Sequence, residues 1–197
     1  MMRRLAPIVP FLALASCGQS DIPGNQLAAE AMSANAGTPA SAARAPAVEA
    51  WASRFTRLDD QACGAERIIE ETGDWDRDCK GVGGYTLEWG SGDLREDLTI
   101  IQGKARTNLD IPTIIAGGAF DSLGKTLEWR GPAGGAPDVL VMRVHVADAE
   151  GRNDSGRLAV ARLTPTPCLV AIVPLGPEQS DRARAIADGK LPDCLKN

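Results

Sequence analysis

The chain has 197 residues, a formal net charge of −5 and one histidine. This length is sufficient for one domain with a substantial hydrophobic core, so a single folded domain is expected. The acidic balance and the lack of a lysine and arginine cluster argue against nucleic acid and anionic headgroups as partners, because both require a basic surface.

The first 16 residues have the organisation of an export signal. Arg3 and Arg4 form a short basic region, an apolar stretch over 5–14 is too short to span a bilayer, and Leu14-Ala15-Ser16-Cys17 follows. This pattern resembles the signal of bacterial lipoproteins. The resemblance implies that residues 1–16 are a signal peptide and that Cys17 becomes the acylated first residue of the mature protein. The alternative is an ordinary secretory signal in which Cys17 has no special role.

Residues 17–50 are predicted to be a disordered tether that carries the lipid. The segment is rich in alanine, serine, proline and glycine and has no aromatic residue, so it cannot bury enough surface to offset its ordering entropy. Several acyl chains on one cysteine would be sufficient for stable membrane attachment. Gly18 is not an aspartate, which by resemblance to lipoprotein sorting signals implies the periplasmic face of the outer membrane.

Residues 51–197 are predicted to form one mainly β domain of the α+β class. The alternation of apolar and polar residues indicates an antiparallel sheet of about seven strands, among them 85–89, 94–100, 127–129, 139–146, 158–163 and 168–173. The last of these is continuously apolar, which favours a central strand covered on both faces. Residues 179–188 indicate a C-terminal helix that ends at Gly189.

The order of several short motifs in this region resembles a group of secreted alphaproteobacterial proteins. After Phe55 and Cys63, the motifs are Cys79-Lys-Gly-Val-Gly-Gly-Tyr85, Asp93-Leu-Arg95 and Leu127-Glu-Trp-Arg130. The resemblance covers most of 54–188 and implies a shared fold. That group has no assigned activity or catalytic residue, so the resemblance implies nothing about chemistry.

Four cysteines follow Cys17, and an even number in an exported chain predicts disulfides. They are Cys63, Cys79, Cys168 and Cys194. Three connectivities are possible. Short loops favour Cys63 with Cys79 and Cys168 with Cys194, and the second bridge would attach the helix to the sheet. Zinc is less favoured because there is no Cys-x-x-Cys pair and only one histidine, and no cofactor is expected.

Three motifs look catalytic but lack their required context. Ala119 to Thr126 fits a relaxed phosphate-binding loop, yet a strand pattern follows where a helix should begin, so no nucleotide is expected. Ser122 and Lys125 have the Ser-x-x-Lys spacing of penicillin-interacting enzymes without the companion motifs. His145 with Asp148 would be needed for a serine triad. On a strand, however, His145 shares a face with Arg143, which favours a solvated surface histidine.

Asp74, Asp76 and Asp78 are a weak calcium candidate, because carboxylates two residues apart can converge on a hard cation. Cys79 stands where the turn glycine of a calcium loop belongs, and Tyr85 stands where its glutamate belongs. A solvated acidic turn is the simpler interpretation, and no metal is predicted.

The sequence therefore favours a non-catalytic binding or interaction module, attached to the membrane by lipid and facing an envelope protein or other ligand. Trp75 and Tyr85 are the candidate recognition residues, whereas the alternation around Trp89 and Trp129 predicts core positions. One alternative is an envelope hydrolase with paired carboxylates such as Glu88 and Asp93. Another is an inhibitor of a periplasmic enzyme. No catalytic residue is assigned.

Overall fold

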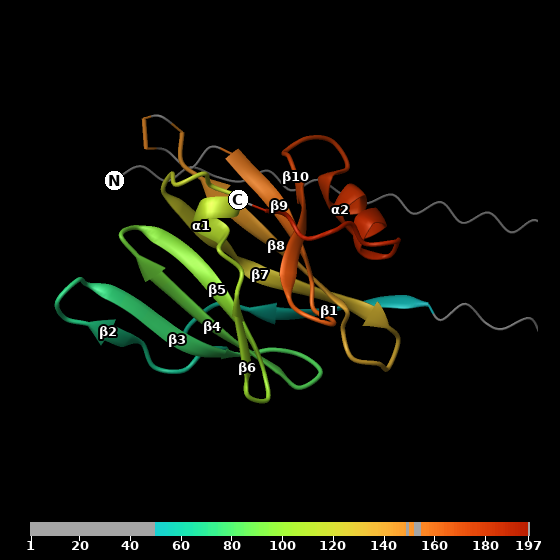
Figure 1. Ribbon diagram of the computed structural model, residues 1–197, viewed down its shortest axis with the longest axis horizontal. Coiled ribbons are helices and arrows are strands. Elements are labelled where there is room, and N and C mark those ends of the chain that lie inside the picture. The colour runs from blue at the N-terminus through green and yellow to red at the C-terminus, as the bar shows by residue number, and fades with distance from the viewer. Residues whose placement is uncertain (1–49, 149, 152–154, 197) are drawn as a thin grey trace, which may run out of the picture. The chain divides into compact units, whose positions relative to one another are not determined.

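The computed structural model describes residues 50–148, 150–151 and 155–196, which form two five-stranded antiparallel sheets and two short helices (Figure 1). The predicted signal peptide, Cys17 and almost all of the tether lie outside these residues. No helix in the described part is long and apolar enough to cross a membrane.

The first sheet, called sheet A, contains strands from both ends of the domain. Its order is β1-β7-β8-β9-β10, with β1 at Trp51–Arg57, β7 at Asp121–Pro132, β8 at Val139–Val146, β9 at Ser155–Arg162 and β10 at Cys168–Val173. The second, sheet B, is a meander in chain order. It contains β2 at Arg67–Ile69, β3 at Asp74–Lys80, β4 at Tyr85–Gly92, β5 at Arg95–Gln102 and β6 at Ala105–Asn108. Sheet B is thus inserted between β1 and its partner β7.

The prediction of a mainly β, antiparallel domain with a terminal helix is confirmed, but the prediction of one sheet of about seven strands is wrong. The strands that the sequence pattern did not predict are the short or polar ones. On β3, for example, the inward positions are Trp75, Arg77 and Cys79, and the arginine interrupts the apolar alternation. The alternation of apolar and polar residues also indicates which face of a strand is buried, but it does not indicate which sheet the strand joins.

The main core lies between the inner faces of the two sheets. Alternate residues of β4 and β5 meet alternate residues of β7 and β8, as the period of a strand requires. The shared residues include Leu87, Trp89, Leu98, Ile100, Leu127, Trp129, Leu140, Met142 and Val144. The core positions predicted for Trp89 and Trp129 are confirmed. Helix α1 (Ile111–Ile114) adds Ile111 and the adjoining Ile115 to the same core.

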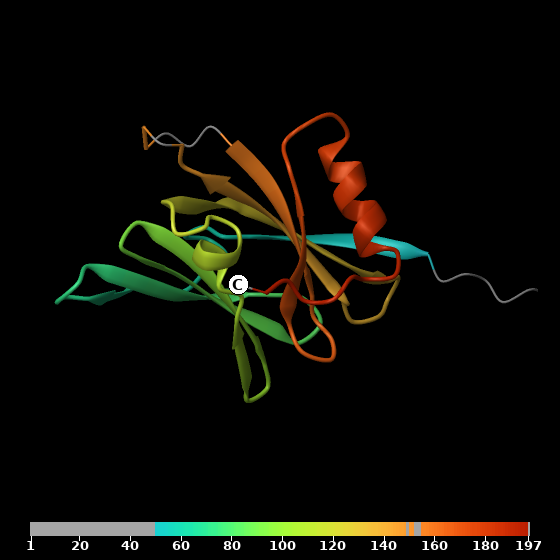
Figure 2. The same ribbon diagram turned by 45° about the horizontal axis from the view of Figure 1, so that its top comes forward.

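A second, smaller core lies on the opposite face of sheet A, beneath helix α2 (Gln179–Ala187). Ala183 and Ala187 of α2 pack on Val139, Val141 and other apolar residues of β9 and β10. Figure 2 shows α2 on one side of sheet A and sheet B on the other. Because α2 is only nine residues long, it covers part of this outer face and leaves the rest open.

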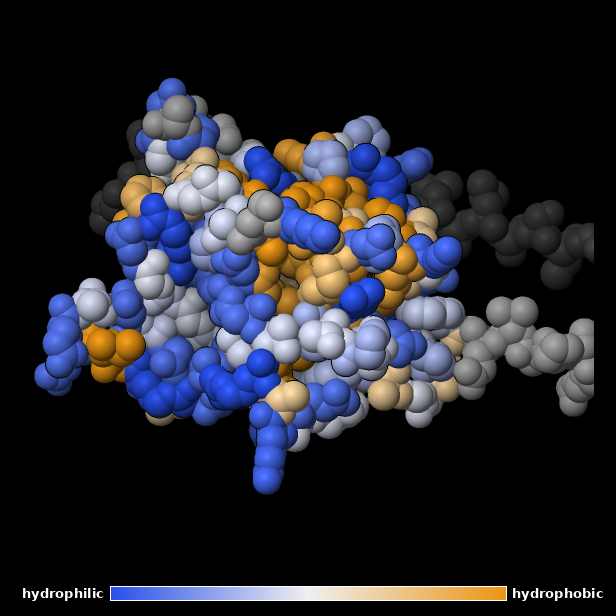
Figure 3. All heavy atoms as spheres, in the orientation of Figure 1, coloured by the Kyte–Doolittle hydropathy of each residue, from blue (hydrophilic) through white to orange (hydrophobic). Residues whose placement is uncertain are grey.

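Strand β10 is covered on both faces, as predicted, but it is the edge of sheet A and not a central strand. The C-terminal segment lies against this edge, where the amide of Leu195 donates to the carbonyl of Leu169 at 2.8 Å. The pairing of edge groups limits intermolecular strand addition. In the view of Figure 3, hydrophobic residues gather around β10, while mainly hydrophilic residues cover sheet B.

Both predicted disulfides are confirmed. Cys63–Cys79 joins the loop after β1 to β3 across a Cα–Cα distance of 4.0 Å. Cys168–Cys194 joins the start of β10 to the C-terminal segment across 5.7 Å. The second bridge therefore attaches the segment that follows α2, and the helix itself is held by other contacts.

Candidate functional site

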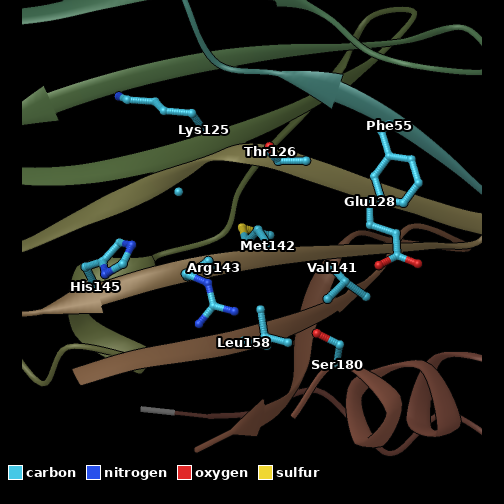
Figure 4. Close-up of a pocket in the computed structure, with 11 residues that line it drawn as sticks. Phe55, Lys125, Thr126, Glu128, Val141, Met142, Arg143, His145, Leu158 and Ser180 are labelled. Atoms are coloured by element: carbon cyan, nitrogen blue, oxygen red, sulfur yellow. The ribbon is translucent and has the colours of Figure 1, made fainter. Parts of the chain in front are cut away.

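The open part of the outer face of sheet A contains a surface hollow of about 340 Å³ (Figure 4). Phe55 of β1, Glu128 of β7 and Leu158 of β9 line it together with Ser180 from the first turn of α2. Val141, Arg143 and His145 of β8 form its floor, because residues two apart on a strand share a face. The predicted shared face of Arg143 and His145 is confirmed. We call this site the outer hollow.

The side chain of Arg143 lies between two glycines of the neighbouring strands, which have no side chains to occupy the same space. A Cβ atom added at Gly124 of β7 would lie 2.8 Å from the Cβ of Arg143, and one added at Gly156 of β9 would lie 2.9 Å from its Nη1. Cβ atoms do not approach other heavy atoms so closely. Glycine at both positions therefore makes room for the arginine side chain on the sheet surface.

Gln179, at the start of α2, fixes the direction of this arginine. Nη1 of Arg143 donates to Oε1 of Gln179 at 3.0 Å. The amide group of Gln179 donates in turn to the carbonyls of Gly156, at 2.9 Å, and Val173, at 3.0 Å. Gln179 is only 7% exposed, so its hydrogen bonds are shielded from water. A side chain constrained in this way loses little entropy when it binds a ligand.

The charge of Arg143 is not neutralised by any carboxylate in the described part of the chain, since its partner there is the neutral amide of Gln179. Glu128, at the other end of the hollow, is in the opposite situation. Arg184 donates to it at 2.9 Å, Ser53 at 2.5 Å and Arg130 at 3.1 Å. Burial raises the pKa of Glu128, but these hydrogen bonds outweigh it and hold the pKa below its usual value. The hollow therefore has a net cationic end at Arg143.

The rest of the lining is apolar. Phe55 is 57% exposed and stands at the end of the hollow near Glu128 in Figure 4. Val141 lies opposite Glu128 in the pairing of β7 and β8, and Leu158 lies opposite Arg143 in the pairing of β8 and β9. Lys125 is at the rim, but its ammonium group lies 4.1 Å from the ring centroid of Trp89 in the main core and is directed away. The hollow thus combines an apolar surface with one oriented guanidinium group and a neighbouring imidazole.

The two predicted recognition residues lie on sheet B and not in the outer hollow. Tyr85 is buried and its ring stacks on Trp129 at a centroid distance of 6.0 Å. Trp75 is half-buried and packs edge-on against Trp89 at 4.8 Å. Arg77 lies over both tryptophan rings, at 5.6 and 5.5 Å from their centroids. Most of this aromatic surface is therefore used in packing.

The carboxylates considered in the sequence are not brought together in a pocket. Glu88 accepts from Arg106 at 2.7 Å on the outer face of sheet B. Asp93, in the turn after β4, pairs instead with Arg95. Asp76 and Asp78 both pair with Arg67, and the nearby carboxylate of Asp74 accepts from the amide of Asp93. The described residues include no group of three or more histidine, cysteine, aspartate or glutamate side chains able to hold a metal ion.

Sequence reasoning missed a carboxylate pair at the junction of β5 and β7. Asp121 accepts from the amide of Glu96 at 3.1 Å, and Glu96 accepts from the amide of Leu123 at 2.8 Å and from Nε1 of Trp89 at 3.0 Å. Asp121 is 5% exposed, and burial together with nearby negative charge raises its pKa to about 6, despite the backbone hydrogen bond. These contacts link the two sheets.

Replacing Asp121 with asparagine should therefore stabilise the protein at neutral pH. The folded state favours the protonated form of Asp121, so ionisation destabilises the fold as the pH rises from about 4 through about 6, and the penalty is complete above that range. The side-chain amide of an asparagine would keep an acceptor for the backbone amide of Glu96 without the charge. We expect Asp121→Asn to raise the free energy of unfolding by about 1 to 3 kcal/mol at pH 7.5 and by almost nothing at pH 4, as measured by urea denaturation.

Asp93→Asn, at an exposed position, is the control for this prediction. A loss of stability at pH 7.5 would contradict the assignment.

The outer hollow was only partly visible in the sequence. The outward positions of β8 change from Val139 and Val141 to Arg143 and His145, and this change marks where the cover of α2 ends. Comparison with protein-family models, curated proteins and solved structures gave no match to the chain. The described residues form a two-sheet, disulfide-linked β domain with a cationic surface hollow.

Proposed function

We propose that this protein is a lipoprotein attached through Cys17 to the periplasmic face of the outer membrane, and that its domain is a non-catalytic binding module. The outer hollow is the proposed ligand site. The observation that carries this proposal is the oriented guanidinium group of Arg143, which lies beside an apolar surface and is paired with no described carboxylate. A fixed charge without a protein counter-ion supports recognition of a ligand that supplies one.

The arrangement of the hollow supports binding more than hydrolysis. A carboxylic acid catalyst needs a raised pKa to donate a proton near neutral pH, whereas the pKa of Glu128 is lowered by its hydrogen bonds. Ser122 lies opposite His145 in the pairing of β7 and β8, yet the described contacts include no hydrogen bond between them. Glu88 and Asp93, the carboxylates of the hydrolase alternative, have separate arginine partners.

Two features support a location in the cell envelope. The first is the lipoprotein-like signal that ends at Cys17. The second is the pair of disulfides, since such bonds persist in oxidising compartments and are rare in reducing ones.

The anchoring is tested by Cys17→Ser. We expect the wild-type protein in the outer-membrane fraction and the variant in the soluble periplasmic or unprocessed pool, because the acyl chains would be the membrane anchor. Immunoblots of separated membrane and soluble fractions measure this, with Ser20→Ala as the matched control that should stay on the membrane. A Cys17→Ser protein that still co-fractionates with the outer membrane would refute lipid attachment at this residue. Binding at the outer hollow is tested separately by the titrations below.

A further inference from the structure

The geometry of the outer hollow points to the chemical class of its ligand, and this inference rests on the proposed function of the hollow as the ligand site. We propose that it binds a small amphiphilic anion: a molecule with an apolar body and one terminal acidic group, such as a carboxylate, sulfonate or phosphate. The acidic group lies against Arg143 and His145, and the apolar body lies against Phe55, Val141 and Leu158.

The cationic end has unused capacity for an anion. A guanidinium group has five N–H donors in a fixed plane, and Nη1 of Arg143 has one described acceptor, the side chain of Gln179. This planar arrangement matches acidic groups that accept two hydrogen bonds at once. His145 lies two residues along the same strand, on the same face. The two side chains form one end of the hollow in Figure 4.

The opposite end sets the orientation of the ligand. Phe55 presents a largely exposed ring there, and Val141 lies in the same row of the sheet. Leu158 lies opposite Arg143 in the pairing of β8 and β9, so it extends the apolar surface toward the arginine. Glu128 lies beside this end and keeps its negative charge because its pKa is lowered. An acidic group at that end would meet a carboxylate whose arginine partners are already engaged. The anion is therefore directed toward Arg143, and the apolar part toward Phe55.

The size of the hollow limits the ligand to a small molecule. Its volume of about 340 Å³ lies near the lower end of the range of about 300–1,000 Å³ that ligand sites occupy. The hollow is open along the sheet surface, so an apolar part that exceeds this volume can extend past Phe55.

Two fluorescent probes that differ only in the acidic group test the inference. Anilinonaphthalene sulfonate has an aromatic body and a sulfonate, and phenylnaphthylamine is the same body without it. Both are titrated into the full chain with Cys17→Ser, so that lipid does not contribute to the signal. We expect the sulfonate probe to bind more tightly than the neutral probe. Arg143→Gln should weaken the sulfonate probe about 10- to 100-fold and leave the neutral probe unchanged, which is the typical contribution of a hydrogen bond to a charged group.

Two further variants separate position from charge. In Gly156→Ala the added methyl group would meet Nη1 of Arg143 at 2.9 Å, and this flexible end can move aside without loss of the charge. It should weaken the sulfonate probe several-fold and spare the neutral one. Phe55→Ala should weaken both probes. Arg182→Gln, which removes an exposed arginine of α2 that contacts the carbonyl of Pro174, is the matched control and should change neither.

The outcomes distinguish the two proposals. If both probes bind equally, or if Arg143→Gln and Gly156→Ala leave the sulfonate affinity unchanged while Phe55→Ala weakens both probes, the hollow binds ligands but the anionic class is wrong. If Phe55→Ala affects neither probe, the outer hollow is not the ligand site, and the proposed binding function of the hollow is wrong. If Arg143→Gln weakens both probes through loss of structure, seen as a changed near-ultraviolet circular dichroism spectrum, the result with Gly156→Ala decides.

Discussion

Trp129→Ala is expected to destabilise the fold by about 3 to 5 kcal/mol, the range typical of removing a fully buried aromatic side chain. Trp129 is 0% exposed and lies between the two sheets. Its ring stacks on Tyr85, and its Nε1 donates to Oγ1 of Thr56 on β1 at 2.8 Å. The substitution would leave a cavity and an unpaired hydroxyl group at the junction of sheet A and sheet B. Urea denaturation followed by far-ultraviolet circular dichroism measures the change.

Trp75→Ala is the matched control for this prediction. Trp75 is also an inward-facing tryptophan, but it is half-buried at the margin of the core. We expect it to cost clearly less than Trp129→Ala, because part of its surface is already in water. Equal costs for the two substitutions, or a cost below about 1 kcal/mol for Trp129→Ala, would mean that the inter-sheet core does not centre on Trp129.

The double variant Cys168→Ala and Cys194→Ala is expected to lose about 3 kcal/mol, because the bridge closes a loop across a sequence separation of 26 residues. Its local effect should fall on the C-terminal segment. Without the bridge, Leu195 is held at the edge of β10 mainly by its hydrogen bond to Leu169 and its core contact. Hydrogen exchange should therefore show early loss of protection at the amide of Leu195.

Helix α2 should remain protected in this variant, since other contacts hold it. Arg130 donates to Asp188 at 2.7 Å and Arg184 donates to Glu128. Gln179 donates to the backbone carbonyls of Gly156 and Val173 in sheet A. The pair Cys63→Ala and Cys79→Ala serves as the comparison, with effects confined to the loop after β1 and to β3. Exchange that rises across 179–187 as fast as at Leu195 would show that the bridge, and not the ion pairs, docks the helix.

Much of the fold could be predicted where the chain is simply apolar. The predicted bounds of β8 and β10 match the structure, and α2 was placed to within one residue, because each has a clear hydrophobic period. The disulfide pairs followed from loop length. The position of β10 at an edge did not follow, because the cover of that edge comes from the C-terminal segment, which has no strand pattern of its own.

Only the β8 residues of the outer hollow could be predicted from the sequence to lie on one face. The alternation on β8 places Arg143 beside His145, but the features that make Arg143 a binding group come from other elements. Gly124, Gly156 and Gln179 lie on β7, β9 and α2, and nothing in their local sequence marks them as neighbours. The packing of Tyr85 and Trp75 could not be predicted for a related reason, since they contact tryptophans that are distant in the chain or on another strand.

The insertion of sheet B between β1 and β7 also gives the chain an order of assembly. Every strand of sheet B pairs with a sequence neighbour, so this meander can form from local contacts alone. Strand β1 is made first, yet its partner is β7, with Arg57 opposite Thr126. Closing that long loop is entropically costly, and pairings of this kind slow the folding of β proteins. When the chain emerges N-terminus first, β1 therefore stays unpaired until the whole of sheet B and β7 have followed it. The docking of β1 on β7 is expected to come after the formation of sheet B.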